Sequence, residues 1–446
     1  MKVIDYFRYN VQDIMAEALG KPGRLRDWLL HPETVPDVVH KINRDYMYWG
    51  KAKHHAAAAN VSENELWAFV KHTRASERYF LSFLEENDFS YAYTNVFQEK
   101  VFKIEQLIAE INKDLDPSYS ELMTHYYIDG LIEEAIATSQ FEGAQTQRRV
   151  AKDMLQSNRP PHTHHEYMIK NAYEVSKSLF SHKNKKMSLK TILDIHNRLI
   201  QHTKSDLKSD EYAFRTAGVD IVGHYNKVLF QPTDNPVIIQ KSMDALVLFL
   251  NNESSEKQFI HPLVRAIVIH FWVGYLHPFY DGNGRTARML FYWYLSQYDA
   301  YELIKYVPMS TTLSLRRKGY EDAYLFVEHD DNDLNYFIAY NLDLILTSLV
   351  SFKKHVKETE KKLHSLRERF QAYKLNWRQL SLLQHTIKNP SSAGYTINAY
   401  CEAHQITRIT ATDDLRDLCA KGFLVETKAS KTIVFTAGDL VRKQTG

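Results

Sequence analysis

Apolar residues recur about every three to four positions along most of the chain, which is the spacing of one helix face. In "NVFQEKVFKIEQLIAEINKDL", residues 95–115, one side of a helix would carry Val96, Val101, Ile104, Leu107, Ile108 and Ile111. Glycine and proline are few and cluster between such segments, where they interrupt regular structure. The pattern predicts a mainly α fold.

One interruption of the helical pattern has the alternation of strands. In "GVDIVGHYNKVLFQPTDNP", residues 218–236, the apolar pairs Val219/Ile221 and Val228/Phe230 flank the turn-forming residues "GHYN". Two short apolar runs around a polar turn predict a β-hairpin.

The C-terminal part of the chain reads as a separate unit. Residues 351–370, "SFKKHVKETEKKLHSLRERF", lack glycine and proline and predict a semi-rigid helical connector. Three helical patterns and "FLVETKASKTIVF" then follow, and this order is typical of a winged helix-turn-helix. We therefore expect a helical N-terminal region (1–90), a core (91–345), a connector (346–372) and a winged-helix domain (373–446).

Composition narrows the class of protein. The 446 residues are enough for roughly two to four domains. A formal net charge of +2 favours neither nucleic acid nor a membrane as partner. The first residues lack the apolar segment of a signal peptide, and Cys401 and Cys419 form no CxxC pair that would predict a disulfide framework or a zinc site. A cytoplasmic protein is expected.

The stretch "HPFYDGNGRTAR", residues 277–288, is too rich for a plain turn. Helical spacing precedes it from Pro262 and resumes after it in "RTARMLFYWYLSQY". The stretch therefore joins two buried helices and ends at a helix N-terminus. Free backbone N–H groups, the helix dipole and small glycines make such an N-terminus an anion site.

The side chains of this stretch suit phosphate chemistry. Arg285 and Arg288 are three residues apart and share a helix face, and guanidinium forks match phosphate oxygens. Asp281 supplies a hard oxygen for Mg²⁺, and His277 suits a general base that acts on a hydroxyl. Together they predict phosphoryl or nucleotidyl transfer. The alternative is a helix–turn–helix joint with surface charges.

This stretch resembles the Fic-family motif HPFx[D/E]GNGRxxR at every fixed position. Its flanks "IHPLVRAIVIHFWVGYLHPF", "SLKTILDIHNRLI" and "EYAFRTAGVDIVGHYNKVLFQP" resemble the family too, so that the likeness spans roughly residues 130–345. It implies a Fic-type helical core and transfer of AMP from ATP to a protein hydroxyl.

The resemblance also implies a role for each motif residue. His277 would deprotonate a Ser, Thr or Tyr hydroxyl of a target protein, or of the chain itself. Asp281 would hold Mg²⁺ on the α- and β-phosphates. The remaining roles are phosphate binding by Gly282, Asn283 and Gly284, β-phosphate binding by Arg285 and γ-phosphate binding by Arg288.

The predicted hairpin would be the family's flap. Its residues Val222, Val228, Leu229 and Phe230 would hold the target backbone by strand addition, a mode that needs little sequence specificity. An ordinary surface hairpin is the alternative. Related death-on-curing toxins phosphorylate and have altered loop glycines, whereas phosphocholine transferases use another nucleotide. Gly282 and Gly284 are intact here, which favours AMP transfer over phosphorylation.

A second stretch, "EEAIATSQFEGAQTQRR" (133–149), resembles the family's inhibitory motif [S/T]xxxE[G/N] through Thr138, Glu142 and Gly143. Thr138 and Glu142 are four apart and share a helix face. The resemblance implies that Glu142 pairs with Arg288 and that the enzyme is autoinhibited. The alternative for Glu142 is a solvent-facing side chain.

Partners and rival functions stay open at this point. Asp413, Asp414 and Asp417 lie on or near the helix that would enter a DNA groove, against Arg408 and Arg416, which is the wrong balance for phosphate contacts. Protein docking or support of a homodimer is favoured over DNA. The rival functions are a nucleotide-sensing regulator that acts through the winged helix, and removal of AMP from modified proteins.

Overall fold

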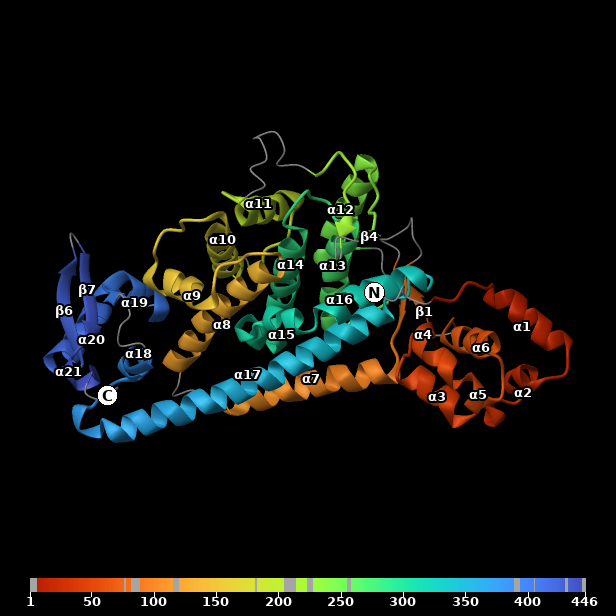
Figure 1. Ribbon diagram of the computed structural model, residues 1–446, viewed down its shortest axis with the longest axis horizontal. Coiled ribbons are helices and arrows are strands. Elements are labelled where there is room, and N and C mark those ends of the chain that lie inside the picture. The colour runs from red at the N-terminus through yellow and green to blue at the C-terminus, as the bar shows by residue number, and fades with distance from the viewer. Residues whose placement is uncertain are drawn as a thin grey trace.

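A computed structural model describes residues 6–75, 78–81, 89–114, 120–180, 183–203, 214–222, 228–254, 258–388, 394–404, 406–429 and 432–442. The mainly α prediction is confirmed, with three small antiparallel sheets between the helices (Figure 1). Within these ranges, no helix combines the length and apolar character needed to cross a membrane.

The N-terminal region is a cluster of short helices at one end of the long axis in Figure 1. Buried ion pairs join it to the core, Lys71 with Asp330 at 2.8 Å and Arg78 with Asp333 at 3.0 Å. The elements are α1 (Val11–Gly20), α2 (Arg24–Leu30), η1 (Pro32–Thr34), α3 (Asp37–Arg44), α4 (Trp49–Ala52), η2 (Lys53–His55), α5 (Ala56–Ala59), α6 (Glu63–Ala75) and the antiparallel strands β1 (Arg78–Phe80) and β2 (Ser90–Ala92).

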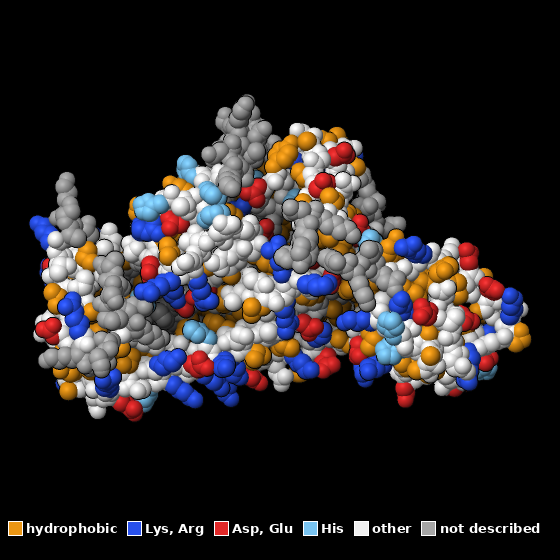
Figure 2. Space-filling model, in the orientation of Figure 1, with side chains coloured by type: hydrophobic (Ala, Val, Ile, Leu, Met, Phe, Trp, Pro, Cys, Tyr) orange, Lys and Arg blue, Asp and Glu red, His pale blue; other side chains and the backbone are white. Residues whose placement is uncertain are grey.

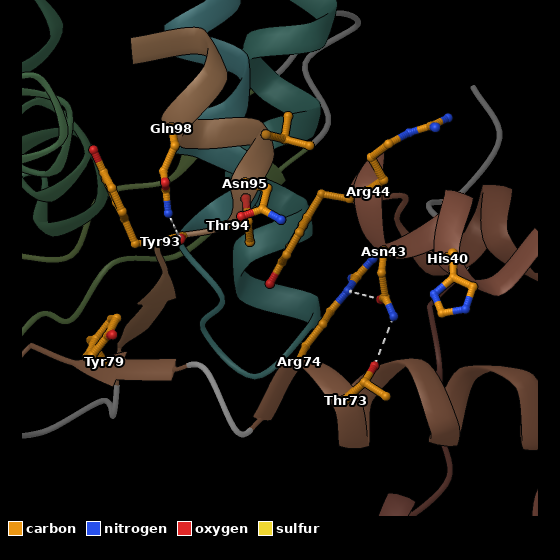
Figure 3. A pocket seen from close by; sticks show the side chains of 12 residues that line it. His40, Asn43, Arg44, Thr73, Arg74, Tyr79, Tyr93, Thr94, Asn95 and Gln98 are labelled. Atoms are coloured by element: carbon orange, nitrogen blue, oxygen red, sulfur yellow. Dashed lines mark hydrogen bonds between the residues drawn. The ribbon is translucent and has the colours of Figure 1, made fainter. Parts of the chain in front are cut away.

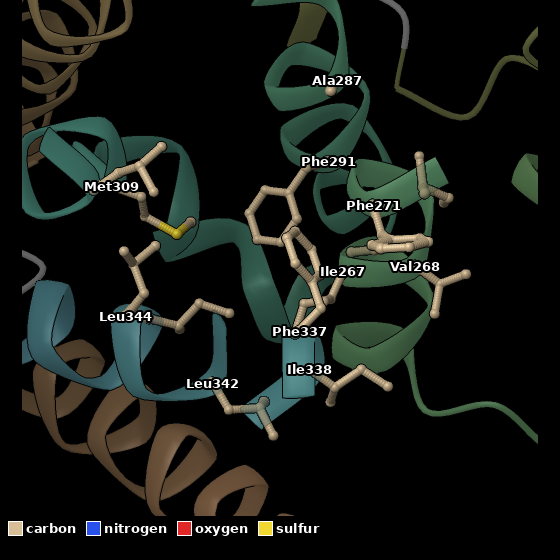
Figure 4. Close-up of a cluster of buried hydrophobic side chains, with 14 of the residues drawn as sticks. Ile267, Val268, Phe271, Ala287, Phe291, Met309, Phe337, Ile338, Leu342 and Leu344 are labelled. Atoms are coloured by element: carbon tan, nitrogen blue, oxygen red, sulfur yellow. The ribbon is translucent and has the colours of Figure 1, made fainter. Parts of the chain in front are cut away.

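The core is built around two helices that are buried on nearly every side. Helix α13 (Pro262–Leu276) starts with a proline in its first turn and is buried from Leu263 through Val273, and α14 (Asn283–Ser296) is buried from Arg285 through Ser296. An all-round apolar helix is stable only inside a bundle. Figure 4 shows side chains of α13 and α14 packed against those of α15 (Met309–Leu315) and α17 (Asn335–Arg369).

Other helices surround this pair and carry the two segments that matter below. Helix α8 (Ser120–Phe141) packs against α10 (His164–Leu179) and α15, and α11 (Leu189–Ile200) packs against α14. The remaining core elements are α7 (Asn95–Asp114), α9 (Arg148–Ser157), β3 (Ile221–Val222), β4 (Val228–Phe230), α12 (Pro236–Leu250), η7 (Asp299–Tyr306) and α16 (Arg317–His329).

The predicted hairpin is present. Strands β3 and β4 pair antiparallel, with Ile221 opposite Phe230 and Val222 opposite Val228. The expected turn residues "GHYN" lie outside the described residues.

Helix α17 is continuous across residues 345 and 346, where the sequence suggested a boundary between core and connector. Over part of its length it contacts α7 (Figure 1), with ion pairs such as Lys353–Glu110 at 2.7 Å and Lys100–Asp343 at 2.8 Å. Blue and red side chains are accordingly interspersed along this edge in Figure 2. The connector thus continues the core helix rather than leaving it as a separate spacer.

The C-terminal unit has its own small apolar core. Its three-stranded sheet has the order β5-β7-β6, and its helices α18 and α19 contact α8. Identification as a winged helix-turn-helix stays a prediction. The elements are η8 (Gln371–Tyr373), α18 (Trp377–Lys388), β5 (Tyr395–Thr396), α19 (Ile397–His404), α20 (Arg408–Ala420), β6 (Leu424–Ala429), β7 (Thr432–Ala437) and α21 (Asp439–Arg442).

One detail of this unit corrects the charge argument made from the sequence. Asp414 of α20 is 8% exposed and pairs with Arg378 of α18 at 2.7 Å, so it faces the interior and not a potential DNA groove. Asp417 accepts a hydrogen bond from Gln379. Asp413 is exposed.

Candidate active site

The loop between α13 and α14 is held in one shape by its own residues. His277 and Gly282 both adopt left-handed backbone conformations, with φ of 49° and 80°. A Cβ on Gly282 would lie 2.9 Å from Ile200, so glycine is needed for both conformation and space. The Asn283 side chain, 2% exposed, accepts from the Phe279 N–H at 2.9 Å and donates to the Phe279 carbonyl at 2.7 Å. Asn283 therefore braces the loop.

Two residues from distant segments hold the same loop from outside. His196 of α11 donates to the Asp281 carbonyl at 2.9 Å, and its ring stacks on Phe279 with centroids 3.6 Å apart. The buried Arg215 donates to the carbonyl of His277 at 2.7 Å and to that of Thr233, which follows β4. Neither contact was predicted. Both residues stand in segments that resemble the family, but nothing in their local pattern indicates a partner at residue 277 or 281.

His277 has the tautomer that a base requires. Its Nδ1 lies 3.2 Å from the carbonyl of Gly274, which can only accept a hydrogen bond, so Nδ1 carries the proton and Nε2 keeps its lone pair. Burial lowers the pKa of the His277 imidazole, an effect partly opposed by the bond to Gly274. The ring is therefore neutral at pH 7 and borders a cavity.

The two motif arginines have different surroundings. Arg285 is fully buried and donates to the Leu199 carbonyl and to Asp281 Oδ2, both at 3.1 Å. Arg288, 4% exposed, donates through Nε to the Thr138 hydroxyl at 2.6 Å and through Nη2 to Glu142 Oε1 at 2.6 Å. Arg285 is therefore tied to the loop and α11, and Arg288 to α8.

The pairing of Glu142 with Arg288 that the resemblance implies is present, and the glycines explain its place. A Cβ on Gly284 would lie 2.2 Å from Glu142 Oε1, so the carboxylate stands directly over the first turn of α14. Gly143, with φ of 98°, ends α8, and Ala144 donates back to the Ser139 carbonyl at 2.9 Å. The turn after α8 thus places the Glu142 carboxylate at the N-terminus of α14, where a helix binds anions.

Two guanidinium donors at this place are not used by any described protein atom. Nη1 of Arg288 and Nε of Arg285 are buried and have no hydrogen-bond partner among the described residues. Gly282, the N-cap of α14, offers no side-chain oxygen to the first N–H groups of the helix. Buried guanidinium donors beside free helix N–H groups fit an anionic ligand.

Asp281 stands at the exposed side of the loop, with 40% of its side chain accessible. Its Oδ1 accepts from the Gly282 N–H at 2.6 Å and its Oδ2 pairs with Arg285. In the described part of the chain, no group of three or more His, Cys, Asp or Glu residues forms a protein-built metal cage. A single carboxylate fits Mg²⁺ that is held mainly by phosphates and water.

A cavity of about 300 Å³ opens beside the motif. His277, Gly284 and Glu142 form one side of it, and Phe230 of the hairpin stacks on Tyr275 with centroids 4.7 Å apart at another. Of the predicted flap residues, the lining includes Val222, Leu229 and Phe230, whereas Val228 is not part of it and is 43% exposed. The aromatic lining is Phe141, Phe230, Tyr275, Tyr320 and Tyr324.

A larger cavity of about 640 Å³ lies far from this chemistry, between the N-terminal helices and the start of α7 (Figure 3). Its most buried cation, Arg74, already donates to Asn43, to the Tyr336 hydroxyl and to two backbone carbonyls. It contains none of the motif residues, so the smaller cavity is the candidate active site.

Comparison with known proteins agrees with this location. Residues 186–295 match the Fic/DOC family. Protein adenylyltransferase Fic of Drosophila willistoni is 36% identical over 104 residues, which are 23% of this chain and 18% of that protein. Protein adenylyltransferase Fic of Nematostella vectensis is 26% identical over 197 residues, 43% of this chain and 41% of that protein. The chain thus spans less than half of either relative.

A solved structure extends the likeness beyond the motif. A crystal structure of a Fic family protein from Desulfovibrio desulfuricans superposes with a TM-score of 0.50 and 16% identity, over 78% of this chain and 97% of that one. At this identity the likeness concerns the fold. Together with the family match and the intact motif in the 277–284 loop and α14, it shows that this chain carries a Fic domain.

Proposed function

We propose that the chain is an autoinhibited protein adenylyltransferase, which moves AMP from ATP to a Ser, Thr or Tyr hydroxyl of a target protein or of itself. The observation that carries the proposal is the Glu142 carboxylate, which covers Gly284 and holds Arg288. The carboxylate stands at the N-terminal end of α14, where a helix binds anions, so it occupies the place that phosphates would take.

ATP would bind along the wall that these residues form. The first N–H groups of α14 would hold phosphate oxygens, and Arg288 would hold the γ-phosphate. Arg285 would support the β-phosphate from the loop. The aromatic side chains of the cavity, among them Tyr275 and Phe230, offer flat apolar surfaces for a purine.

His277 would act as the general base. Its unprotonated Nε2 would take the proton of the target hydroxyl as that oxygen attacks the α-phosphorus. A P–O bond to the target forms, the bond between the α-phosphorus and the bridging oxygen breaks, and pyrophosphate leaves with that oxygen. Asp281 is the residue that would hold Mg²⁺, which would neutralise phosphate charge.

Glu142 would inhibit because it occupies Arg288, the side chain that would otherwise bind the γ-phosphate. With Arg288 engaged, the triphosphate cannot take its in-line position, and the carboxylate repels it. Misplacement of the reacting atom by about 1 Å can cost about 10²-fold in rate. In the alternative function, removal of AMP from a modified protein, Glu142 would instead position the attacking water molecule.

The β3–β4 hairpin would present the target. It is a two-stranded ribbon beside the cavity, and Val222 and Val228 are 49% and 43% exposed. Addition of an extended target segment would satisfy its outer edge.

Incubation with ATP labelled at the α- or the γ-phosphate tests the proposal. The Glu142→Gly protein should transfer label from the α position and none from the γ position. Label from γ alone would mean phosphorylation. Label from neither would favour a nucleotide-sensing regulator, and loss of AMP from a modified protein, abolished by Glu142→Gly, would favour the reverse reaction.

A further inference from the structure

Helix α8 carries a second, buried carboxylate two turns before Glu142. Glu134 is 4% exposed and accepts hydrogen bonds from the Ser310 N–H at 2.9 Å, from the Ser310 hydroxyl and from the Tyr292 hydroxyl at 3.0 Å. Neither the motif nor the proposed chemistry uses this residue. Its donors come from α14, the helix that carries the second half of the motif, and from the start of α15.

Glu134, Thr138 and Glu142 are spaced by four residues, so they lie along one face of α8 about 12 Å from end to end. On α14, Tyr292 follows Arg288 by one turn. The two helices are therefore joined at two levels, Glu134 with Tyr292 and Thr138 and Glu142 with Arg288. Apolar packing holds α8 in the bundle, and these directional bonds add two fixed contacts between α8 and α14.

The two levels differ in accessibility. The Glu142 side chain is 28% exposed and must give way when a γ-phosphate takes Arg288. Glu134 and its donors Ser310 and Tyr292 are not among the residues that line the cavity, so their hydrogen bonds can persist when Glu142 moves. A third tie, from Arg317 to the Phe141 carbonyl at 3.1 Å, involves a side chain that is 52% exposed.

A buried carboxylate is a poor source of stability, because its desolvation offsets most of what its hydrogen bonds contribute. Burial raises the pKa of Glu134, while the bonds from Ser310 and the nearby Arg288 act in the opposite direction. The expected benefit of such a group is therefore a single defined arrangement of α8 and α14.

We propose that Glu134 is a positioning residue that sets the strength of inhibition by holding α8 in the rotation that places Glu142 over Gly284. The inference rests on the proposed AMP transfer and adds its regulation. Without Glu134, α8 would rotate or fray more freely at its C-terminal end. Glu142 would then cover Arg288 for less of the time.

The test measures α-label transfer for Glu134→Ala and Glu134→Gln in the wild-type and Glu142→Gly backgrounds. In the wild-type background, Glu134→Ala should raise transfer by about threefold to tenfold, which is the size expected from the net loss of about one hydrogen bond. Glu134→Gln should raise it less, because its amide oxygen can still accept from the Ser310 N–H and Tyr292. In the Glu142→Gly background, neither change should raise transfer further.

The matched control is Glu133→Gln, which alters the adjacent carboxylate. Glu133 pairs with Lys152 and Arg148 of α9 and not with α14 or α15, so transfer should stay within about twofold of wild type. Ser310→Ala, which removes one donor and keeps the N–H, is the milder variant if Glu134→Ala fails to fold. It should give a smaller gain of the same sign.

Four outcomes separate the claims. Transfer by folded Glu134→Ala equal to wild type would overturn the positioning role, as would an equal gain in the Glu142→Gly background. A rise in kcat with little change in the KM for ATP would support it, because a merely destabilised protein would lose kcat. Absence of α-label transfer from Glu142→Gly alone would instead reject the proposed function.

Discussion

The 277–284 loop and the end of α8 at residues 138–143 face each other across the site, and they are held by different kinds of contact. The loop is held by backbone groups: Asn283 binds Phe279 four residues away, and His196 and Arg215 bind loop carbonyls. The end of α8 reaches the motif through side chains, in contacts that span 146 to 150 residues of sequence. A phosphate would leave the first set of contacts intact and compete directly with the second.

The two arginines repeat this contrast. Arg285 is tied to Asp281 and the Leu199 carbonyl, partners that belong to the loop and its support. Arg288 is tied to an acid and a hydroxyl of another helix. Under the proposed function, the loop side of the site would be a fixed scaffold, and the Glu142 side would be a cover that ATP displaces. Changes to the scaffold should therefore lower AMP transfer, and changes to the cover should raise it.

The largest loss of AMP transfer is expected when His277 is replaced. In the Glu142→Gly background, His277→Ala should lower α-label transfer by about 10² to 10⁴, because the general base is lost. ATP affinity, measured by calorimetry, should stay near that of the parent, because in the proposed mechanism His277 acts on the target hydroxyl and not on the phosphates. Transfer within threefold of the parent would remove His277 from the mechanism.

Asn283→Ala should give the next largest loss. It leaves the N–H and carbonyl of Phe279 without their partners, at a cost of about 1–3 kcal/mol for each group that stays buried. The loosened loop should lower transfer by about 10- to 10²-fold. Transfer is measured in the Glu142→Gly background and unfolding by calorimetry; full activity despite a lower Tm would mean that the loop is not a required scaffold.

Thr138→Val should act in the opposite direction. It removes the hydroxyl that accepts from Arg288 Nε and nearly preserves the shape of a fully buried side chain. The cover is weakened by one charge-assisted bond, so wild-type transfer should rise by about twofold to tenfold. A fall in transfer by a folded Thr138→Val protein would place Thr138 in the scaffold.

The smallest effect concerns pH. Burial holds the pKa of His277 below its usual value of about 6.5, so the ring stays neutral as pH falls to that value. Transfer by Glu142→Gly should therefore differ by less than about twofold between pH 8 and pH 6.5, and should fall only as pH drops through the lowered pKa. Circular dichroism at each pH checks folding. If the transfer rate had already fallen to half of its pH 8 value at a pH above 6.5, the prediction would be contradicted.

The sequence predicted those features that depend on residues close to one another along the chain. The helices, the hairpin and the 277–288 motif each follow from residues that are near neighbours, and the Glu142–Arg288 contact was available through two recognisable motifs. His196 under Phe279, Arg215 on the His277 carbonyl and Asp414 inside the C-terminal unit were not predicted. Their partners are 36 to 85 residues away, and no local periodicity encodes such pairs.

The direction of the Asn283 side chain was also missed. Its type and position fit a phosphate cradle, but both of its polar atoms bind Phe279. Likewise, the amphipathic pattern of residues 351–370 predicts a helix but not that this helix continues α17 and contacts α7. Pattern gives the type of element, and the packing partners decide what each side chain does.

The most direct test of the account is α-label transfer by wild type, Glu142→Gly and Glu142→Gly with Arg288→Ala, at equal protein and ATP concentrations. If Glu142 is a cover over Arg288, the first change should raise transfer by about 10²-fold. The second should remove that gain, because Arg288 then cannot hold the γ-phosphate. Folded Glu142→Gly that is no faster than wild type, or a gain that survives Arg288→Ala, would contradict the account.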